Sequence, residues 1–460
     1  MSGTFILKTI ASVLACKSTR GVLRLMGRGG TALPGKAAMV FDKKILETVS
    51  EGMEIIVVTG TNGKTTTCRM IEHGITSGGV KCLANKSGAN LLSGVTAELT
   101  ANATLFGKPK TKYAVIECDE GALKQVVPLL HPKVIVVTNL FRDQLDRYGE
   151  VMHTLDSIRV GIEKVPEAVL CLNADCSLTS SLALNVPNKI VYYGINQPVG
   201  EQKDQELSDA RHCIRCGAVY GYHSRTYAHL GKFYCPSCGY ARKDPECAVE
   251  EILSLTAGGS EIKMNLFGEE AEVLVHLPAV YNIYNAAAAL CALLRFGISR
   301  EQAIRSLSDV HSSFGRMENF DLGGIPVQMI LVKNPAGCNQ TISYLTSLTE
   351  DFNLVICLND RTADGHDISW IWDADYEKLA ADAHVNRIYV AGERAEDLQL
   401  RLKYAGADED KIVLRKDYKE LLSLLKESTL PVFAMPNYTS MLTLRAILAE
   451  ATGKKEFWEG

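Results

Sequence analysis

The chain has 460 residues, of which 47% are hydrophobic and 22% are charged, and its formal net charge is −4. This length predicts two or three domains, and this composition is typical of a globular protein. The slight negative charge excludes a general electrostatic attraction to nucleic acid or anionic lipid. The 14 cysteines are spread along the chain, which excludes a small disulfide scaffold.

The first 50 residues are too few for a complete nucleotide-binding domain. Within them, FILKTIASVLAC (residues 5–16) is similar to a signal segment, but no basic residue precedes it and Lys8 interrupts it. Its apolar residues recur at helical spacing, which predicts a short amphipathic helix that stays in the mature protein. No other stretch approaches the roughly 20 apolar residues of a membrane span. We therefore expect residues 1–50 to form a short N-terminal segment without a transmembrane helix.

From residue 54 onward, apolar runs alternate with helical patterns, as in an α/β protein with a buried parallel sheet. The runs are EIIVVTG, KYAVIECDE, KVIVVTNL, AVLCLNAD and KIVYYGI. A cysteine-rich insert follows at about 205–248, then a β-hairpin at 261–277 and a long apolar helix that ends at Phe296. We predict one central domain over residues 51–314.

A second α/β pattern begins after the junction GRMEN (residues 315–319). Its apolar runs are PVQMILVKN, FNLVICLND, NRIYVAG, KIVLRK and LPVFAMP, with helical stretches between them. This alternation predicts a separate Rossmann-like domain over residues 315–460.

The motif TGTNGKTTT (residues 59–67) joins an apolar strand to a helical pattern. Glycines in such a loop let backbone N–H groups face phosphate oxygens, and the helix N-terminus adds its positive dipole end. Lys64 is expected to reach the β- and γ-phosphates and Thr65 to bind Mg²⁺, although Val58 stands where the usual motif has its first glycine. The alternative is a glycine turn with a surface lysine. The nucleotide-binding candidates are Thr61, Asn62, Gly63, Lys64, Thr65 and Thr66.

Acidic and amide side chains follow the next two predicted strands. Glu117 and Asp119 come at the end of YAVIECDE. Ligands of open parallel sheets collect at the carboxyl ends of strands, so we expect Glu117 to bind a metal ion beside the phosphates. The following strand ends in a polar turn, for which helix capping is the alternative role. Its polar residues are Asn139, Asp143, Gln144 and Asp146.

The insert carries two C-x-x-C pairs that are separated by 18 residues. This spacing is typical of a zinc ribbon, in which four thiolates close a tetrahedral and structural Zn²⁺ site. The alternatives are two redox-active pairs, or a ribbon that binds nucleic acid through the basic residues and tyrosines around it. The predicted zinc ligands are Cys213, Cys216, Cys235 and Cys238.

These motifs, with YNIYNAAAA, FGRME and TNLFRDQLDRYG, occur in the order seen in Mur ligases, which the chain resembles over roughly residues 54–320. The resemblance implies that Lys64 and Thr65 hold triphosphate and Mg²⁺ and that Glu117 binds Mg²⁺. It also implies that Asn282 and Asn285 contact the adenine side and that Arg316 belongs to the nucleotide site. ATP would phosphorylate a substrate carboxylate, and an amine would attack the acyl phosphate.

Three features depart from ordinary Mur ligases. Gln144 stands where the family has a metal-site histidine, the N-terminal domain that grips a UDP-sugar is missing, and the C-terminal sequence differs. Together with the cysteine insert, these features resemble the MurT family, the ligase-like subunits of lipid II isoglutaminyl synthases. That resemblance implies amidation of the α-carboxyl of D-glutamate in the lipid II stem peptide at the inner membrane face. The ammonia would come from a GatD-like glutaminase partner, in a reducing cytoplasm with free thiols.

The stretch LNDRTADGHDISWIWDAD follows a predicted strand of the C-terminal domain. Its tryptophans offer surface that is common at protein interfaces. The resemblance implies that this domain docks the glutaminase and that one aspartate completes a Cys-His-Asp triad across the interface. Asp360 and Asp364 are the leading candidates for this aspartate, and Asp367 follows. The alternative is that the stretch is only a polar loop with a helix cap. Lys333 and Asn334 are candidates for the acyl-phosphate site.

Two other functions fit parts of the sequence. A stand-alone Mur-type ligase would attach an amino acid and need no glutamine. A nucleic-acid-associated NTPase would use the ribbon, and its ATP hydrolysis would depend steeply on salt. The chain has no recognisable glutaminase nucleophile, since its Gly337-Cys338 pair lacks the turn that such elbows use, which favours an outside source of ammonia.

Overall fold

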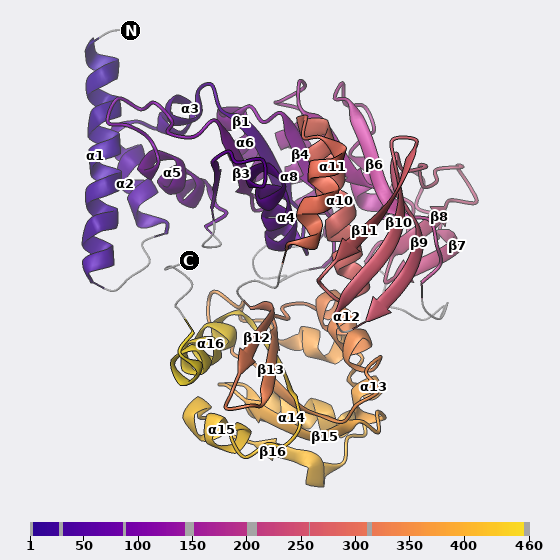
Figure 1. The fold of residues 1–460 in the computed structure, drawn as a ribbon. Helices are drawn as coiled ribbons and strands as arrows, with labels where there is room; N and C mark the ends of the chain where they lie inside the picture. Colours follow the sequence, from indigo (N-terminus) through magenta and orange to yellow (C-terminus); the bar gives the residue numbers. More distant parts are fainter. Residues whose placement is uncertain are drawn as a thin grey trace.

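The computed structural model describes residues 3–26, 31–85, 89–142, 151–199, 209–256, 258–310 and 315–454. Two large sheets lie in separate halves of the molecule, with the first sheet above the second in Figure 1. The two sheets contribute to separate hydrophobic cores, one around the first sheet and two around the second.

The first sheet has nine strands within the described residues, in the order β11-β10-β9-β6-β5-β4-β1-β3-β2. Neighbouring strands from β2 to β9 run parallel, and β10 and β11 add an antiparallel hairpin. Their bounds are β1 (Glu54–Thr59), β2 (Cys82–Ala84), β3 (Tyr113–Glu117), β4 (Val134–Val137), β5 (Val169–Asn173), β6 (Ile190–Ile195), β9 (Cys247–Thr256), β10 (Gly259–Leu266) and β11 (Glu269–Val275).

Helices cover both faces of this sheet, as a parallel sheet requires. They are α4 (Lys64–Thr76), α6 (Leu123–Leu130), α8 (Val151–Ile162), α9 (Ser177–Ser181), α10 (Val280–Phe296) and α11 (Arg300–Ser308). Helix α10 is buried along most of its length, and its alanine run lets it lie close to its neighbours. A Cβ atom on Gly74 of α4 would come 2.4 Å from the side chain of Leu293 of α10, so the two helices pack closely at this glycine.

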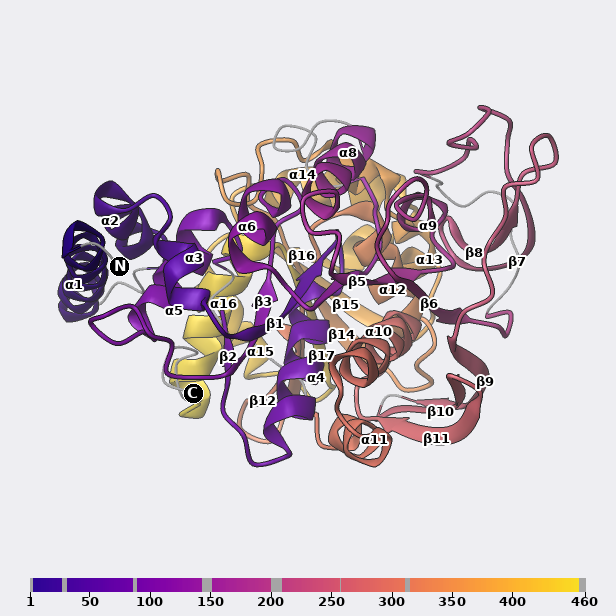
Figure 2. The ribbon, with the colours of Figure 1, turned by 90° about the horizontal axis from the view of Figure 1, so that it is seen from above.

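The N-terminal helices form an outer layer at one edge of the molecule (Figures 1 and 2). They are α1 (Gly3–Leu25), α2 (Leu33–Phe41) and α3 (Ile45–Ser50), and they pack beside α5 (Leu92–Ala101). The expected short helix is therefore 23 residues long. Among the described residues, no helix has both the length and the apolar character needed to cross a membrane.

The second sheet has six strands within the described residues, in the order β12-β13-β17-β14-β15-β16. The first pair is antiparallel and the other pairs are parallel. The strands are β12 (Arg316–Asp321), β13 (Pro326–Ile330), β14 (Phe352–Cys357), β15 (Val385–Ala391), β16 (Ile412–Leu414) and β17 (Val432–Pro436). The helices of this half are α12 (Pro335–Leu345), η1 (Ser369–Asp373), α13 (Tyr376–Ala380), α14 (Ala395–Tyr404), η2 (Glu409–Lys411), α15 (Tyr418–Leu425) and α16 (Tyr438–Thr452).

The cysteine-rich insert leaves the first sheet after β6 and returns as β9, which pairs directly with β6. It contains the antiparallel hairpin of β7 (Gly221–Tyr227) and β8 (Leu230–Tyr234). This hairpin lies at the opposite edge of the molecule from α1 in both views (Figures 1 and 2).

Candidate active site

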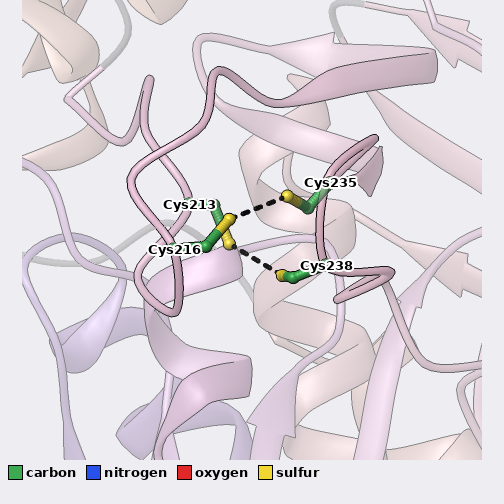
Figure 3. A group of neighbouring side chains, drawn as sticks. All are labelled: Cys213, Cys216, Cys235 and Cys238. Carbon is green, nitrogen blue, oxygen red and sulfur yellow. Dashed lines mark hydrogen bonds between the residues drawn. The ribbon is translucent and has the colours of Figure 1, made fainter.

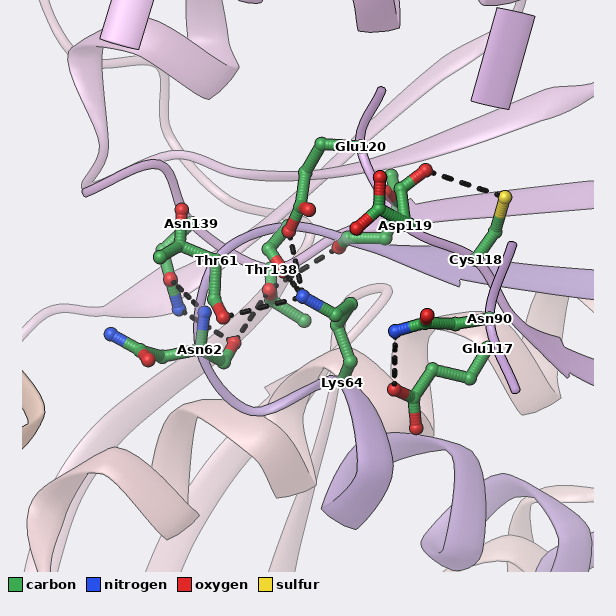
Figure 4. Close-up of polar contacts among 12 residues, drawn as sticks. Thr61, Asn62, Lys64, Asn90, Glu117, Cys118, Asp119, Glu120, Thr138 and Asn139 are labelled. Carbon is green, nitrogen blue, oxygen red and sulfur yellow. Dashed lines mark hydrogen bonds and ion pairs between the residues drawn. The ribbon is translucent and has the colours of Figure 1, made fainter. Parts of the chain in front are cut away.

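The predicted phosphate loop connects β1 to α4 at the carboxyl edge of the first sheet (Figure 4). Two of its glycines have positive φ angles, 119° at Gly60 and 84° at Gly63. A Cβ atom on Gly60 would lie 2.3 Å from the Thr138 hydroxyl, and one on Gly63 would lie 2.1 Å from the Asn285 amide oxygen. Both positions therefore require glycine for conformation and for space.

Side chains at the end of β4 hold this loop in place. The Asn62 N–H donates to Oδ1 of Asn139 at 2.9 Å, and the Asn62 carbonyl accepts from the Thr138 hydroxyl at 2.7 Å. The Thr61 hydroxyl accepts from the Phe141 N–H at 3.0 Å. Asn139 thus lies at the loop as predicted, whereas Asp143, Gln144 and Asp146 lie outside the described residues.

Lys64 opens α4 with its ammonium group turned back into the loop (Figure 4). It is buried, and its Nζ donates to the Gly60 carbonyl at 2.5 Å and to Glu120 Oε1 at 2.7 Å. Burial opposes the positive charge, but the carboxylates of Glu120, Glu117 and Asp119 outweigh it and raise the pKa of Lys64 to about 12. Sequence reasoning missed Glu120 as the ion-pair partner, although it is the third acidic residue of ECDE.

The two predicted magnesium ligands meet beside the loop. The Thr65 hydroxyl donates to Oε2 of Glu117 at 2.8 Å, and Oε1 of Glu117 accepts from the Asn90 amide at 3.3 Å. Asn85 makes two 2.8 Å hydrogen bonds to the backbone of Glu117, which fixes the end of β3. A hydroxyl and a carboxylate are oxygen ligands of the kind that Mg²⁺ prefers, so these residues fit the ion. Asp119 instead accepts from the Gly121 N–H at 3.0 Å.

A cavity of about 830 Å³, its open mouth included, lies between the two sheets next to the loop. Six of the nine predicted nucleotide residues line it, namely Asn62, Gly63, Thr66, Asn282, Asn285 and Arg316, whereas Thr61, Lys64 and Thr65 do not. The Arg316 guanidinium also reaches the Thr65 hydroxyl at 3.5 Å. The cavity therefore gathers residues from both halves of the chain around the phosphate loop.

The far wall of this cavity is the first turn of α12, which includes Ala336 and Gly337. Asn334 caps that helix by accepting from the Gly337 N–H at 2.8 Å. It also exchanges two amide hydrogen bonds with Asn62, at 3.2 and 3.4 Å, and so joins the second sheet to the phosphate loop. Burial raises the pKa of Glu120, and the ammonium groups of Lys64 and the nearby Lys333 oppose that rise.

The four insert cysteines form a compact cluster (Figure 3). Their sulfur atoms all lie within 4.8 Å of one another, with 3.6 Å between Cys213 and Cys238 and 3.4 Å between Cys216 and Cys235. Four sulfurs at about 2.3 Å from a tetrahedral Zn²⁺ would show similar separations. Burial raises the pKa of Cys235, but the N–H groups of Cys238 and Ser237 outweigh it and lower that pKa to about 6, which favours a thiolate. The donor set fits zinc.

The insert is tied to the first sheet by buried polar contacts that the sequence did not reveal. The Asp175 carboxylate forms an ion pair with Arg242 of the insert and accepts from the Tyr284 hydroxyl at 2.6 Å. Tyr227 of β7 stacks on Phe141 at a ring distance of 6.0 Å and lines the nucleotide-side cavity. The insert thus supplies part of the cavity wall.

The three candidate aspartates of the C-terminal half have different surroundings. Asp364 is buried and accepts from the Thr439 N–H at 2.7 Å at the start of α16, and burial raises its pKa. Asp367 is half-buried and accepts from the Ser369 N–H at 2.8 Å. Asp360 is half-buried and lies 3.9 Å from Arg394.

Two family descriptions match this chain. Residues 58–233 match the Mur ligase middle domain, and residues 331–441 match the MurT ligase C-terminal domain. The chain is 36% identical to the lipid II isoglutaminyl synthase (glutamine-hydrolyzing) subunit MurT of Streptococcus pneumoniae, over 96% of this chain and 97% of that protein. It is 35% identical to the MurT subunit of Staphylococcus aureus, over 92% of this chain and 94% of that protein.

Solved structures share the fold at lower identity. A pseudomurein peptide ligase type C from Methanothermus fervidus superimposes with a TM-score of 0.65 at 19% identity, covering 86% of this chain and 79% of that one. The MurF ligase of Thermotoga maritima, solved in complex with ADP, gives a TM-score of 0.61 at 12% identity, covering 90% of this chain and 84% of that one.

Proposed function

This chain belongs to the MurT family of Mur-type ligases, and from this premise we propose that it is the ligase subunit of a lipid II isoglutaminyl synthase. Such an enzyme converts the α-carboxyl of D-glutamate in the lipid II stem peptide to the amide of D-isoglutamine. The observation that carries the proposal is the 36% identity to a named MurT subunit over 96% of the chain. The phosphate loop beside the cavity supports the use of ATP.

The reaction divides into two balanced steps. A carboxylate oxygen of the substrate attacks the γ-phosphorus of ATP, and ADP leaves. Ammonia then attacks the carbonyl carbon of the acyl phosphate, phosphate leaves, and one proton is released with formation of the amide. Positioning and charge neutralisation dominate catalysis of such phosphoryl transfers.

The residues of the phosphate loop supply most of that positioning in this proposal. Lys64 and the backbone N–H groups from Thr61 to Thr66 hold the triphosphate. Thr65 and Glu117 hold Mg²⁺, which neutralises charge on the phosphates. Asn282, Asn285 and Arg316 hold the remainder of the nucleotide, because they line the cavity next to the loop.

From the same family membership, we assign three units to the chain. Residues 51–314 form the nucleotide-binding unit, with a Cys₄ zinc ribbon inserted at about 205–248. Residues 315–460 form the unit that docks the partner, after the N-terminal segment of residues 1–50. The compact cysteine cluster supports the structural zinc site.

The partner in this proposal is a GatD-like glutaminase that forms a heterodimer with the chain and releases ammonia from glutamine. The word subunit in the names of the MurT relatives supports a complex of this kind. Asp360 and Asp367 are the better candidates for the interface carboxylate, because Asp364 is buried and caps α16. The lipid-linked substrate would place the enzyme at the inner face of the cell membrane.

The test is the mass of purified lipid II after incubation with the chain, ATP, Mg²⁺ and ammonium chloride. A parallel arm replaces ammonium with glutamine and a co-expressed glutaminase. We expect the mass to fall by the difference between OH and NH₂, and we expect Lys64→Ala to slow this change by about 100-fold or more. Lipid II of unchanged mass in both arms, with ATP hydrolysed on another acceptor, would overturn the substrate assignment.

A further inference from the structure

Helix α1 has apolar side chains on two opposite faces. One face, which includes Val13 and Cys16, is buried in the first half of the molecule. The other face carries residues spaced by seven, eight and three positions, which fall on one side of a helix of 3.6 residues per turn. These residues are Leu7, Leu14, Val22 and Leu25, with exposed fractions of 69%, 47%, 57% and 91%.

Helix α2 lies beside α1 and has exposed apolar side chains of its own. Leu33 at its start and Val40 and Phe41 at its end are each more than half exposed. Both views place α1 and α2 at the outer edge of the molecule, away from the insert and β9–β11 (Figures 1 and 2). We call six exposed apolar side chains of the two helices the outer face; they are Leu7, Leu14, Val22, Leu25, Leu33 and Val40.

The charge of this region is opposite to that of the whole chain. Residues 1–41 contain six lysines and arginines and no acidic residue, whereas the complete chain has a net charge of −4. Lys17 and Arg20 turn inward, since Lys17 donates to the Ala103 carbonyl at 2.6 Å and Arg20 pairs with Glu98 at 3.2 Å. Lys8, Arg24 and Lys36 are exposed on the same two helices. An exposed apolar stripe on helices that also carry exposed basic side chains is typical of helices that lie in a membrane interface.

We propose that the outer face of α1 and α2 binds the surface of an anionic lipid bilayer, with α1 lying in the plane of the interface. The apolar side chains enter the boundary between headgroups and acyl chains, and the basic side chains contact lipid phosphates. A second copy of the chain is a poorer occupant, because it would bring two sets of like charges together. The proposal rests on these side chains and does not depend on the ligase reaction.

The test is flotation of the full-length chain, alone and with its glutaminase, on vesicles that contain no lipid II. We expect binding to vesicles of phosphatidylglycerol and phosphatidylcholine, and little binding to phosphatidylcholine alone or in high salt. The triple variant Leu7→Gln, Leu14→Gln, Leu25→Gln should bind at least about tenfold more weakly. The variant Lys8→Gln, Arg24→Gln, Lys36→Gln should lose the preference for anionic vesicles.

A matched control replaces three exposed leucines at the opposite edge of the molecule. Leu253, Leu255 and Leu274 lie on β9 and β11 and are each a little under half exposed, and their replacement by glutamine should leave vesicle binding unchanged. The proposal is overturned if the natural chain does not float with anionic vesicles, or if the control variant loses as much binding. It is also overturned if the natural chain is a dimer and the triple leucine variant is a monomer, because a second copy of the chain would then cover the outer face. Because the readout is flotation, failure here leaves the amidation test unaffected, and the reverse also holds.

Discussion

Lys64 and Glu120 form a buried ion pair inside the loop that would receive the triphosphate. The ammonium group donates to Glu120 and to the carbonyls of Gly60 and Thr61, so a phosphate must compete with these acceptors for it. Removing one member of a buried pair leaves the other charge uncompensated, which usually costs about 3 kcal/mol or more. The pair therefore links the stability of the nucleotide-free protein to its affinity for ATP.

We expect Glu120→Gln to lower the melting temperature of the nucleotide-free protein and to enlarge the stabilisation that ATP and Mg²⁺ produce. The reason is that the triphosphate would supply the negative charge that the variant lacks. Thermal unfolding with and without nucleotide measures both effects.

The control for this prediction is Glu318→Gln. Glu318 of β12 is also buried, and it pairs with Arg445 of α16 at 3.0 Å rather than with a residue of the phosphate loop. The Glu318→Gln variant should destabilise the protein without changing the stabilisation that ATP and Mg²⁺ produce. An equal nucleotide effect in both variants would contradict the competition between Glu120 and phosphate.

Single residues of the site were predictable where a local motif carries the chemistry. Lys64, Thr65 and Glu117 follow from the loop pattern and from the end of an apolar strand, and the structure brings Thr65 and Glu117 to 2.8 Å. Asn85 and Tyr227 were not predictable. They reach the site through contacts with residues far along the chain, which leave no local pattern in the sequence.

At the level of elements, the insert is a small unit that depends on its cysteines. The β7–β8 hairpin has a core of only a few aromatic residues, and so small a core rarely holds a fold without a metal or a disulfide. Through Tyr227 the hairpin also forms part of the cavity wall. Loss of the metal should therefore affect the nucleotide as well as the insert.

We expect metal analysis to find about one zinc per chain, as a closed four-thiolate site requires. Removal of the metal with a chelator should lower the melting temperature and weaken ATP binding by about threefold to tenfold, which corresponds to the free-energy contribution of one aromatic contact. The Cys216→Ser variant should show the same lower melting temperature and weaker ATP binding. Cys247→Ser is the control, since Cys247 is a buried cysteine at the start of β9 outside the cluster. Unchanged ATP affinity in the zinc-free protein would show that the insert does not shape the cavity.

Strands were predictable where both faces of the sheet are buried. The sequences EIIVVT of β1 and FNLVIC of β14 are continuous apolar runs, because helices cover both sides of them. Strands β9 and β12 were missed because they carry acidic residues within the run. On β9 these residues are exposed, whereas Glu318 of β12 is held by the buried ion pair with Arg445.

At the scale of the whole molecule, the proposed partnership with a glutaminase predicts that one variant can affect glutamine-driven amidation without affecting ammonium-driven amidation. We expect Asp360→Asn and Asp367→Asn to leave ammonium-driven amidation of lipid II intact. The one that completes the partner's triad should lower glutamine-driven amidation by up to about 10⁴-fold, the scale of losing the carboxylate that orients a catalytic histidine. Both rates are measured on the purified heterodimer.

Asp364→Asn serves as the structural control for that pair of variants. Its carboxylate caps α16 through Thr439, so its loss should lower stability and both rates together. If neither Asp360→Asn nor Asp367→Asn separates the two rates, the interface carboxylate lies elsewhere in the complex.

The overall charge of the chain was a poor guide to its surface. A net charge of −4 averages over 460 residues and hides the basic first 41. The order of the two sheets along the chain was readable from its apolar runs, but the cavity between them was not, because its walls come from β7, α10 and α12 at once.

The amide pair between Asn62 and Asn334 has a consequence for turnover. Each side chain both donates to and accepts from the other, at 3.2 and 3.4 Å, and neither carries a charge. Neutral hydrogen bonds of this kind contribute about 1 kcal/mol each, so the pair favours contact between the two halves by only about one to two powers of ten. The pair alone is therefore too weak to lock the halves together at the loop, and it would offer little resistance to the departure of ADP.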